Sequence, residues 1–139
     1  MQETLRRMRE KRAGGDHGFT LIELLVVVVI IGVLVAIAIP VYLNYRKGAE
    51  NRAAQSDVRS SITAVEQCYA DNNNAYPDTK PEVTGPAALT LTCVNGDQKV
   101  NVSPNNKMTY TLVAAGHYTV AVVGPNKTYT YDNQTGQIS

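Results

Sequence analysis

The 139-residue sequence lacks the residue patterns on which most enzymes depend. It has only two histidines, His17 and His117, and no glycine-rich phosphate loop, so no catalytic constellation or nucleotide site is apparent. Its two cysteines stand far apart, without the paired short spacings of zinc ligands. No internal repeat predicts a solenoid. We therefore expect no enzymatic activity, no metal and no cofactor.

Most of the chain also lacks an excess of charge of either sign. The exception is the first eighteen residues, which hold five of the thirteen basic residues and only three acidic ones. The rest is close to neutral, whereas a protein that binds nucleic acid through its phosphates needs a basic surface. The sequence thus offers no support for a DNA ligand or for another surface ligand.

What the sequence has in abundance is one long apolar run. Every residue from Leu24 to Ile39 is apolar or glycine, and the stretch from Phe19 to Ile39 is 21 residues long. A helix over about 21 residues, at about 1.5 Å per residue, spans about 31 Å, the thickness of a bilayer's hydrocarbon core. We therefore predict a membrane-spanning helix over residues 19–40.

The charges around this run predict its orientation and single out one residue. The basic first segment places the N-terminus in the cytoplasm by the positive-inside rule, so the residues after the run lie outside. Glu23 then sits about one helical turn inside the membrane interface. An ionisable side chain at this depth is costly, which makes Glu23 a candidate functional residue.

An amphipathic pattern follows Pro40 and predicts that the helix continues over residues 41–70, because apolar residues recur there at spacings of three and four. The apolar positions are Ala54, Val58, Ile62, Val65 and Tyr69. The charged positions are Arg46, Lys47, Glu50, Arg52, Asp57, Arg59 and Glu66, which we assign to a solvated face. Pro40 lacks a backbone donor and Gly32 weakens its own turn, so we expect the helix to bend or melt most easily between them.

The C-terminal part is expected to form a small sheet. Residues 71–86 are rich in Asn, Pro and Asp and predict a loop that ends the helix. The strands are expected at residues 89–94, 99–102, 108–114, 117–123 and 128–131, the last three as an antiparallel meander. A sheet with one apolar face gives the amphipathic half of the helix a surface to pack on, so the predicted class is α+β.

The two cysteines, Cys68 and Cys93, both lie in the part predicted to be outside the cytoplasm. A disulfide is the favoured state in that compartment. It would close a loop of about 24 residues and stabilise the fold by about 3 kcal/mol in the chain-entropy model. Two separately buried thiols are the alternative.

Two simple interpretations of the N-terminus leave residues unexplained. A cleaved secretory signal would account for the basic start, the apolar stretch and the small residues around Ala36 and Ala38, but Glu23 and Pro40 disagree with it. A plain membrane anchor would account for the length and the basic start. It would not account for Glu23.

The segment from Gly18 to Glu23, GFTLIE, resembles the prepilin signature of type IV pilins and their relatives, and the apolar run with Gly32 and Pro40 follows it. The resemblance is close from Gly18 to Arg46. It is looser over residues 69–77, which are similar to the segment that ends the helix in many of these proteins. The resemblance implies the pilin fold, in which a long N-terminal helix packs on a small antiparallel sheet over residues 71–139.

The resemblance also implies how the N-terminus is processed and used. A prepilin peptidase would remove residues 1–18 by cutting between Gly18 and Phe19, and the new amine of Phe19 would be methylated. Glu23 would neutralise the N-terminal amine of a neighbouring subunit. The helices over Leu24 to Ile39 would leave the lipid and pack together as the filament core.

The partners implied by the resemblance are those of a filament that grows from a membrane. They are other pilin subunits, the peptidase, membrane lipid before assembly, an inner-membrane assembly platform and a separate motor ATPase. The filament would then lie outside the cell and serve adhesion, motility or DNA uptake. A pseudopilin of a type II secretion or competence system is one alternative, and a membrane-anchored binding module that does not polymerise is another.

Overall fold

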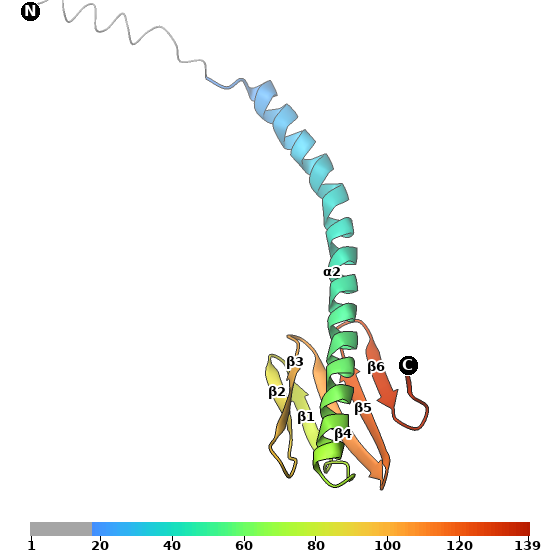
Figure 1. Cartoon of the computed structure of the whole chain (residues 1–139). Coiled ribbons are helices and arrows are strands. Elements are labelled where there is room, and N and C mark those ends of the chain that lie inside the picture. Colours follow the sequence, from blue (N-terminus) through green and yellow to red (C-terminus); the bar gives the residue numbers. More distant parts are fainter. Residues whose placement is uncertain (1–17) are drawn as a thin grey trace, which may run out of the picture. The chain divides into compact units, whose positions relative to one another are not determined.

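The computed structural model describes residues 18–139, which form one long helix and two antiparallel sheets (Figure 1). The elements are α2 (Leu21–Asp71), β1 (Lys80–Thr84), β2 (Ala87–Leu91), β3 (Gln98–Val102), β4 (Lys107–Ala114), β5 (His117–Val123), β6 (Thr128–Asp132) and β7 (Gln137–Ile138). The predicted α+β class is confirmed. Apart from Gly18, the expected leader lies outside the described residues. The chain divides into two compact units, the second of which, Leu43–Ser139, is called the globular unit below.

The apolar run lies within α2, and its residues are helical without a break through Gly32 and Pro40. Greater flexibility between these two residues stays a prediction. Among the described residues, α2 is the one helix long and apolar enough to cross a membrane.

The second half of α2 packs on the sheets, but the buried face differs from the one predicted. The buried residues are Ala54, Asp57, Val58, Ser61, Val65 and Cys68, whereas Ile62 and Tyr69 are only half-buried. The assignment of Asp57 to the solvated face was wrong. Its burial has a physical reason, described below, in hydrogen bonds from a distant turn.

Helix α2 ends in a run of asparagines. Asn73 and Asn74 have positive φ angles of 53° and 60°, a conformation that asparagine tolerates better than most residues. The N–H of Asn74 donates to the carbonyl oxygen of Tyr69 at 3.1 Å, which satisfies one of the free carbonyls of the last turn. The chain then turns back along the helix toward β1.

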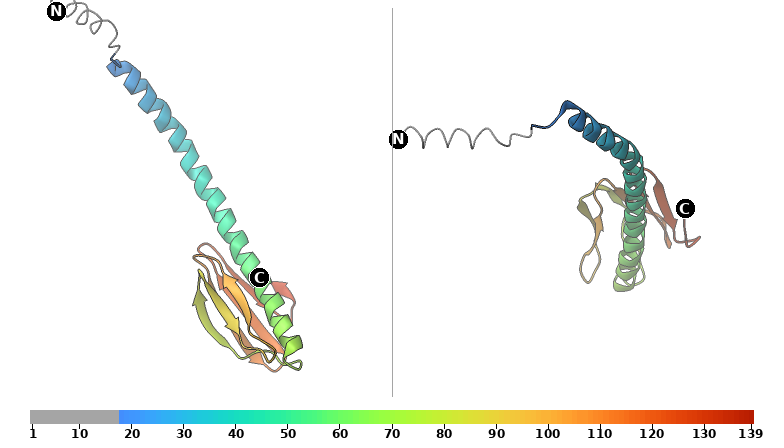
Figure 2. Two further views of the ribbon diagram at one scale, coloured as in Figure 1. Left: turned by 60° about the vertical axis from the view of Figure 1, so that its left-hand side comes forward. Right: turned by 90° about the horizontal axis from the view of Figure 1, so that it is seen from above.

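The larger sheet has the order β1-β4-β5-β6-β7, and all its pairs are antiparallel (Figure 2). The predicted meander of β4, β5 and β6 is confirmed, with Tyr110 opposite Val120 and Val122 opposite Tyr129. These side chains alternate between a buried face, which contributes to the core, and an outer face rich in threonine. The outer strands β1 and β7 were not predicted.

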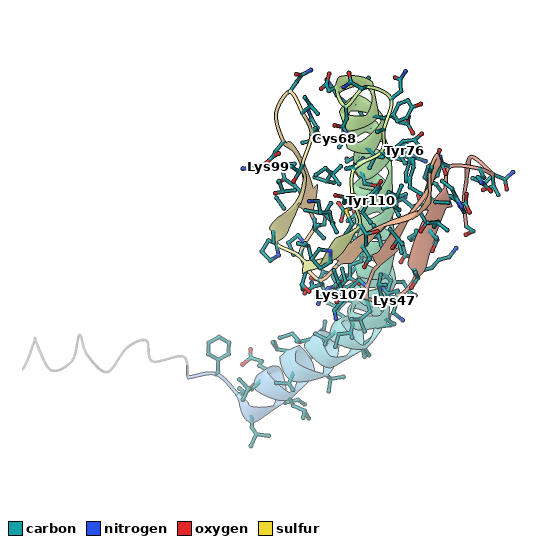
Figure 3. The ribbon with its side chains drawn as sticks, turned by 90° about the horizontal axis from the view of Figure 1, so that it is seen from below. Lys47, Cys68, Tyr76, Lys99, Lys107 and Tyr110 are labelled. Atoms are coloured by element: carbon teal, nitrogen blue, oxygen red, sulfur yellow. A yellow bond between two sulfur atoms is a disulfide. The ribbon has the colours of Figure 1, made fainter. Side chains whose placement is uncertain are left out.

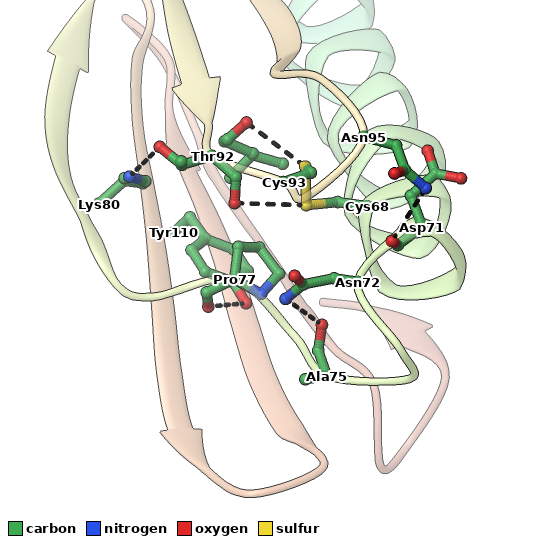
Figure 4. The surroundings of a disulfide bond; sticks show 11 residues. Cys68, Asp71, Asn72, Ala75, Pro77, Lys80, Thr92, Cys93, Asn95 and Tyr110 are labelled. Carbon is green, nitrogen blue, oxygen red and sulfur yellow. Dashed lines mark hydrogen bonds between the residues drawn. A yellow bond between two sulfur atoms is a disulfide. The ribbon is translucent and has the colours of Figure 1, made fainter.

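The smaller sheet, β2 with β3, is joined to α2 by a disulfide between Cys68 and Cys93 (Figure 4). The two Cα atoms are 5.4 Å apart, and both residues are buried. The link connects the last turns of the helix to the residues that follow β2. The alternative of two separate thiols is therefore wrong.

Replacing both cysteines by serine should lower the stability of the globular unit by about 3 kcal/mol, because the unfolded chain regains the freedom of a closed loop. Thermal unfolding of the oxidised full chain, followed by circular dichroism, would measure the loss. The same chain unfolded in reducing agent should match the double variant. Equal melting temperatures for oxidised wild type and double variant would contradict the prediction.

Candidate assembly surface

Helix α2 begins with a capping box formed by Thr20 and Glu23. The Thr20 hydroxyl oxygen accepts a hydrogen bond from the Glu23 N–H at 3.2 Å, and a Glu23 carboxylate oxygen accepts from the Thr20 N–H at 2.8 Å and from its hydroxyl at 2.9 Å. This reciprocal arrangement satisfies backbone donors at the helix start. Glu23 is therefore partnered within its own chain, a role that the sequence analysis missed.

A shallow groove of about 410 Å³ lies beside Glu23 on the same part of the helix, lined also by Phe19, Ile22, Val26 and Val27. Its lining is apolar except for the carboxylate of Glu23. A carboxylate in an apolar surface attracts a cation, because the charge is screened less there than in water. The groove can thus accommodate a small apolar group that carries a positive charge.

The apolar surface continues from this groove along the first half of α2. Its side chains are exposed throughout, from Phe19, which is 86% exposed, to Ile39, which is 53% exposed. A contiguous apolar surface of this length is not stable in water and needs lipid or protein to cover it. The predicted assembly residues Glu23, Leu24 and Ile39 all belong to it.

In the globular unit, the buried carboxylate of Asp57 joins α2 to the turn between β3 and β4. It accepts hydrogen bonds from the Ser103 N–H at 2.9 Å, the Ser103 hydroxyl at 2.8 Å and the Asn106 side-chain amide at 2.7 Å. Both Asp57 and Asn106 are buried. We refer to these three residues as the Asp57 latch, since they hold the helix against the turn.

A group of stacked tyrosines holds the other end of α2. Tyr118 lies at the centre, with ring centroids 4.7 Å from Tyr76 and 5.7 Å from Tyr110. Tyr110 occupies the space between helix and sheet (Figure 3). Burial, together with its hydrogen bond to Glu66, raises the pKa of Tyr118 far above its ordinary value, so the hydroxyl stays protonated and donates to the Glu66 carboxylate at 2.8 Å.

The other polar candidates do not converge on a site. His117 pairs with Asp132, with 3.2 Å between Nε2 and the carboxylate oxygen. Within residues 18–139, no group of three or more His, Cys, Asp or Glu side chains is arranged to hold a metal ion. Of the residues that the sequence analysis missed, Thr20 could have been found from its spacing to Glu23, because Thr-x-x-Glu is a capping signature.

The N-terminal segment matches a known family model. Residues 15–39 match the model described as the prokaryotic N-terminal methylation motif. The match contains the groove, Glu23 and the apolar surface from Phe19 to Ile39.

Curated relatives extend the similarity into the globular unit. A fimbrial protein of Pseudomonas aeruginosa is 38% identical over 103 residues, which cover 71% of this chain and 67% of the relative. A type IV major fimbrial protein of Dichelobacter nodosus is 48% identical over 60 residues, or 43% of this chain and 38% of the relative.

A third relative belongs to a secretion machine. The type II secretion system core protein G of Pectobacterium carotovorum is 40% identical over 65 residues, which cover 47% of this chain and 41% of the relative. No solved structure shows significant similarity to this chain.

Proposed function

Because this chain belongs to the type IV pilin family and is a structural subunit of a pilus, we propose that its exposed apolar helix is first a membrane anchor and then the core of the filament. The observation that carries this proposal is the uncovered apolar surface from Phe19 to Ile39, with one carboxylate in a groove at its start. Lipid covers such a surface before assembly, and neighbouring copies of the helix cover it afterwards.

Each segment of the chain has a different role in this cycle. Residues 1–18 are a leader that is cut off, residues 19–40 cross the membrane and later polymerise, residues 41–70 continue the same helix, and residues 71–139 form the extracytoplasmic sheet. The basic leader keeps the N-terminus in the cytoplasm until the cut. Flexibility between Gly32 and Pro40 would help the helix to move from lipid into the filament.

Cleavage between Gly18 and Phe19 creates the group that the Glu23 groove can bind. A new N-terminal amine is a small cation, and the side chain next to it is the apolar ring of Phe19. We propose that this amine, methylated, enters the groove of a neighbouring subunit and pairs with Glu23. A charge pair in an apolar core selects one register of the packed helices more than it adds cohesion.

The proposed partners follow from this cycle. A prepilin peptidase makes the cut, and an assembly platform with a motor ATPase in the inner membrane raises the subunit out of the lipid. The names of the relatives are those of structural fimbrial proteins, which suggests a structural and not a catalytic role for this chain. Its site of action is the membrane before assembly and the extracellular filament afterwards.

A secretion pseudopilin is the second candidate, because the core protein G relative is 40% identical. The fimbrial relative favours the pilus, since its similarity covers 71% of this chain and that of core protein G covers 47%. A membrane-anchored module that does not polymerise is the third candidate. Surface filaments that contain this chain as their main protein would exclude it.

The mature subunit should begin at methylated Phe19. Mass spectrometry of the protein from cells that contain the peptidase would measure the terminal residue and the added methyl group, with cells that lack the peptidase as the control. Replacing Gly18 by valine should block the cut, because a bulky side chain obstructs access of a protease to the backbone. A mature N-terminus at Ile39 would instead support a secretory signal.

A further inference from the structure

The charges of the globular unit are divided between its two ends. The entry end consists of the first turns of α2 in this unit together with the β3–β4 turn and the β5–β6 turn. The Asp57 latch joins the helix to the β3–β4 turn. The Asn126 amide, 2.7 Å from a Glu50 oxygen, joins the helix to the β5–β6 turn. Its basic residues are Arg46, Lys47, Arg52, Lys107 and Lys127, and its acidic residues are Glu50, Asp57 and Glu82. The entry end is therefore net positive.

The far end consists of the last turns of α2 with the β2–β3 and β4–β5 turns (Figure 1). The Asn95 amide contacts the carbonyl oxygen of Asp71 at 3.4 Å, and Tyr118, just after the β4–β5 turn, bonds to Glu66. Its acidic residues are Glu66, Asp71, Asp78, Asp97 and Asp132, and its basic residues are Lys80 and Lys99. The far end is net negative, and the exposed Arg59 lies between the two ends.

Several of these charges take part in no ion pair within the part of the chain that the structure describes. The ion pairs formed among the described residues are Arg46–Glu50 and Lys107–Glu82, and His117 contacts the carboxylate of Asp132. Lys47 and Arg52 at the entry end, and Asp71, Asp78 and Asp97 at the far end, take part in none of them. Lys80 and Lys99 at the far end are also absent from these pairs, but the acidic side chains there outnumber them, so the two ends differ in the sign of their net charge.

The entry end also has a hollow next to one of its unpaired cations. A depression of about 210 Å³ is lined by Asn44, Tyr45, Gly48, Ala49 and Arg52. It exists because Gly48 and Ala49 have little or no side chain, and the space at Gly48 is open. Arg52 can donate to a carboxylate that enters this hollow, with the planar geometry that suits a bidentate pair.

We propose that the entry end of one globular unit docks onto the far end of a second copy of this chain, with Lys47 and Arg52 paired to its acidic side chains. The inference rests on the proposed function, because subunits in a filament share one direction and present unlike ends to each other. Such a head-to-tail contact joins two different surfaces and repeats without closing, as a filament requires. The paired charges of this contact help to fix the register in which the helices of neighbouring subunits pack.

Reversing the entry-end charges should reduce filament assembly. In the full chain, Lys47→Glu combined with Arg52→Glu places like charges against the far end, and surface filaments counted by electron microscopy should fall about tenfold or more. Adding Asp71→Lys and Asp97→Lys to that chain should restore filaments at least partly, because both ends are then reversed. Immunoblots of total and membrane fractions establish that each variant accumulates in its oxidised form.

Lys99→Glu is the control at the far end, because it makes the same Lys-to-Glu change there, where Lys99 points outward (Figure 3). It adds negative charge to the surface that the basic entry end meets, so filament numbers should not fall below those of wild type. Equal numbers in this control and in the entry-end variant would overturn the docking surface, whereas absence of filaments from wild type would overturn the proposed function itself. Loss of the entry-end variant from the membrane, without rescue by the far-end changes, would assign Lys47 and Arg52 to anionic lipid instead.

A second measurement keeps the test decisive if the reversed variants do not accumulate. Purified wild-type filaments should shed subunits faster in about 1 M salt than in about 0.1 M salt, because the screening length falls from about 10 Å to about 3 Å. Shedding is measured as the pilin left in the supernatant after the filaments are pelleted. Shedding that does not depend on salt would contradict the proposal.

Discussion

Filaments should be lost when Glu23 is replaced by glutamine, although the helix should still begin correctly. Glutamine serves in a capping box as well as glutamate does, so the hydrogen bonds with Thr20 can form. It cannot neutralise the amine of a neighbouring Phe19. A charge left without its partner in an apolar core costs about 3–5 kcal/mol, which corresponds to more than a hundredfold in an assembly equilibrium, at about 1.4 kcal/mol per factor of ten.

Thr20→Val is the matched control for this result, because it removes the hydroxyl of the cap and leaves the charge of Glu23. Loss of a cap costs about 1 kcal/mol, so filament numbers should fall only about fivefold. Thr20→Ser, which keeps the hydroxyl, should behave as wild type. Electron microscopy counts the filaments, and mass spectrometry establishes that each variant is cut and methylated.

The two roles of Glu23 predict different orders for these variants. If Glu23 acts only as a cap, the glutamine variant assembles normally and Thr20→Val, with its loss of about fivefold, is the more impaired of the two. That result would refute the pairing between subunits while leaving the family assignment intact.

The globular unit should lose about 3 kcal/mol of stability when Asp57 is replaced by alanine. Three hydrogen bonds disappear, and the buried Asn106 amide and the half-buried Ser103 N–H each lose their acceptor. For a unit of this size the melting temperature should fall by more than about 10 °C. Near-ultraviolet circular dichroism of the full chain in detergent would follow the unfolding through the packed tyrosines.

Two further variants distinguish the Asp57 latch from a general effect of charge. Ser103→Ala removes one of the three bonds and keeps the one from the backbone, so it should cost about 1 kcal/mol. Asp97→Asn removes an exposed carboxylate and should leave the melting temperature unchanged. If the Asp57→Ala protein has the same melting temperature as wild type, the latch does not hold the helix.

The features that could be predicted from the sequence are those encoded by neighbouring residues. The apolar run is visible as an unbroken stretch of sequence. The helix shows its period in the spacing of Ala54, Val58 and Val65, and strands β4 to β6 show theirs in the alternation of buried and outer residues. The capping box was equally local and could have been found. These elements are therefore fixed largely by short segments of the chain.

The features that could not be predicted depend on residues far apart. Asp57 looks like an exposed helix charge until Ser103 and Asn106, which follow it by 46 and 49 positions, surround it. Strand β1 carries Pro81 and lacks a clear alternation, and it is a strand because the edge of β4 pairs with it around an irregularity. No local pattern contains such information.

Under a pulling force, the Cys68–Cys93 bond determines how far one subunit can lengthen. The loop of about 24 residues between these cysteines could extend by about 80 Å if it were open, at about 3.3–3.6 Å per residue. Because the bond closes it, that length cannot be drawn out, and a load on α2 passes through the bond to the residues after β2. Unfolding of this loop therefore cannot lengthen a filament of such subunits. Any extension of the filament under load must come from the helices.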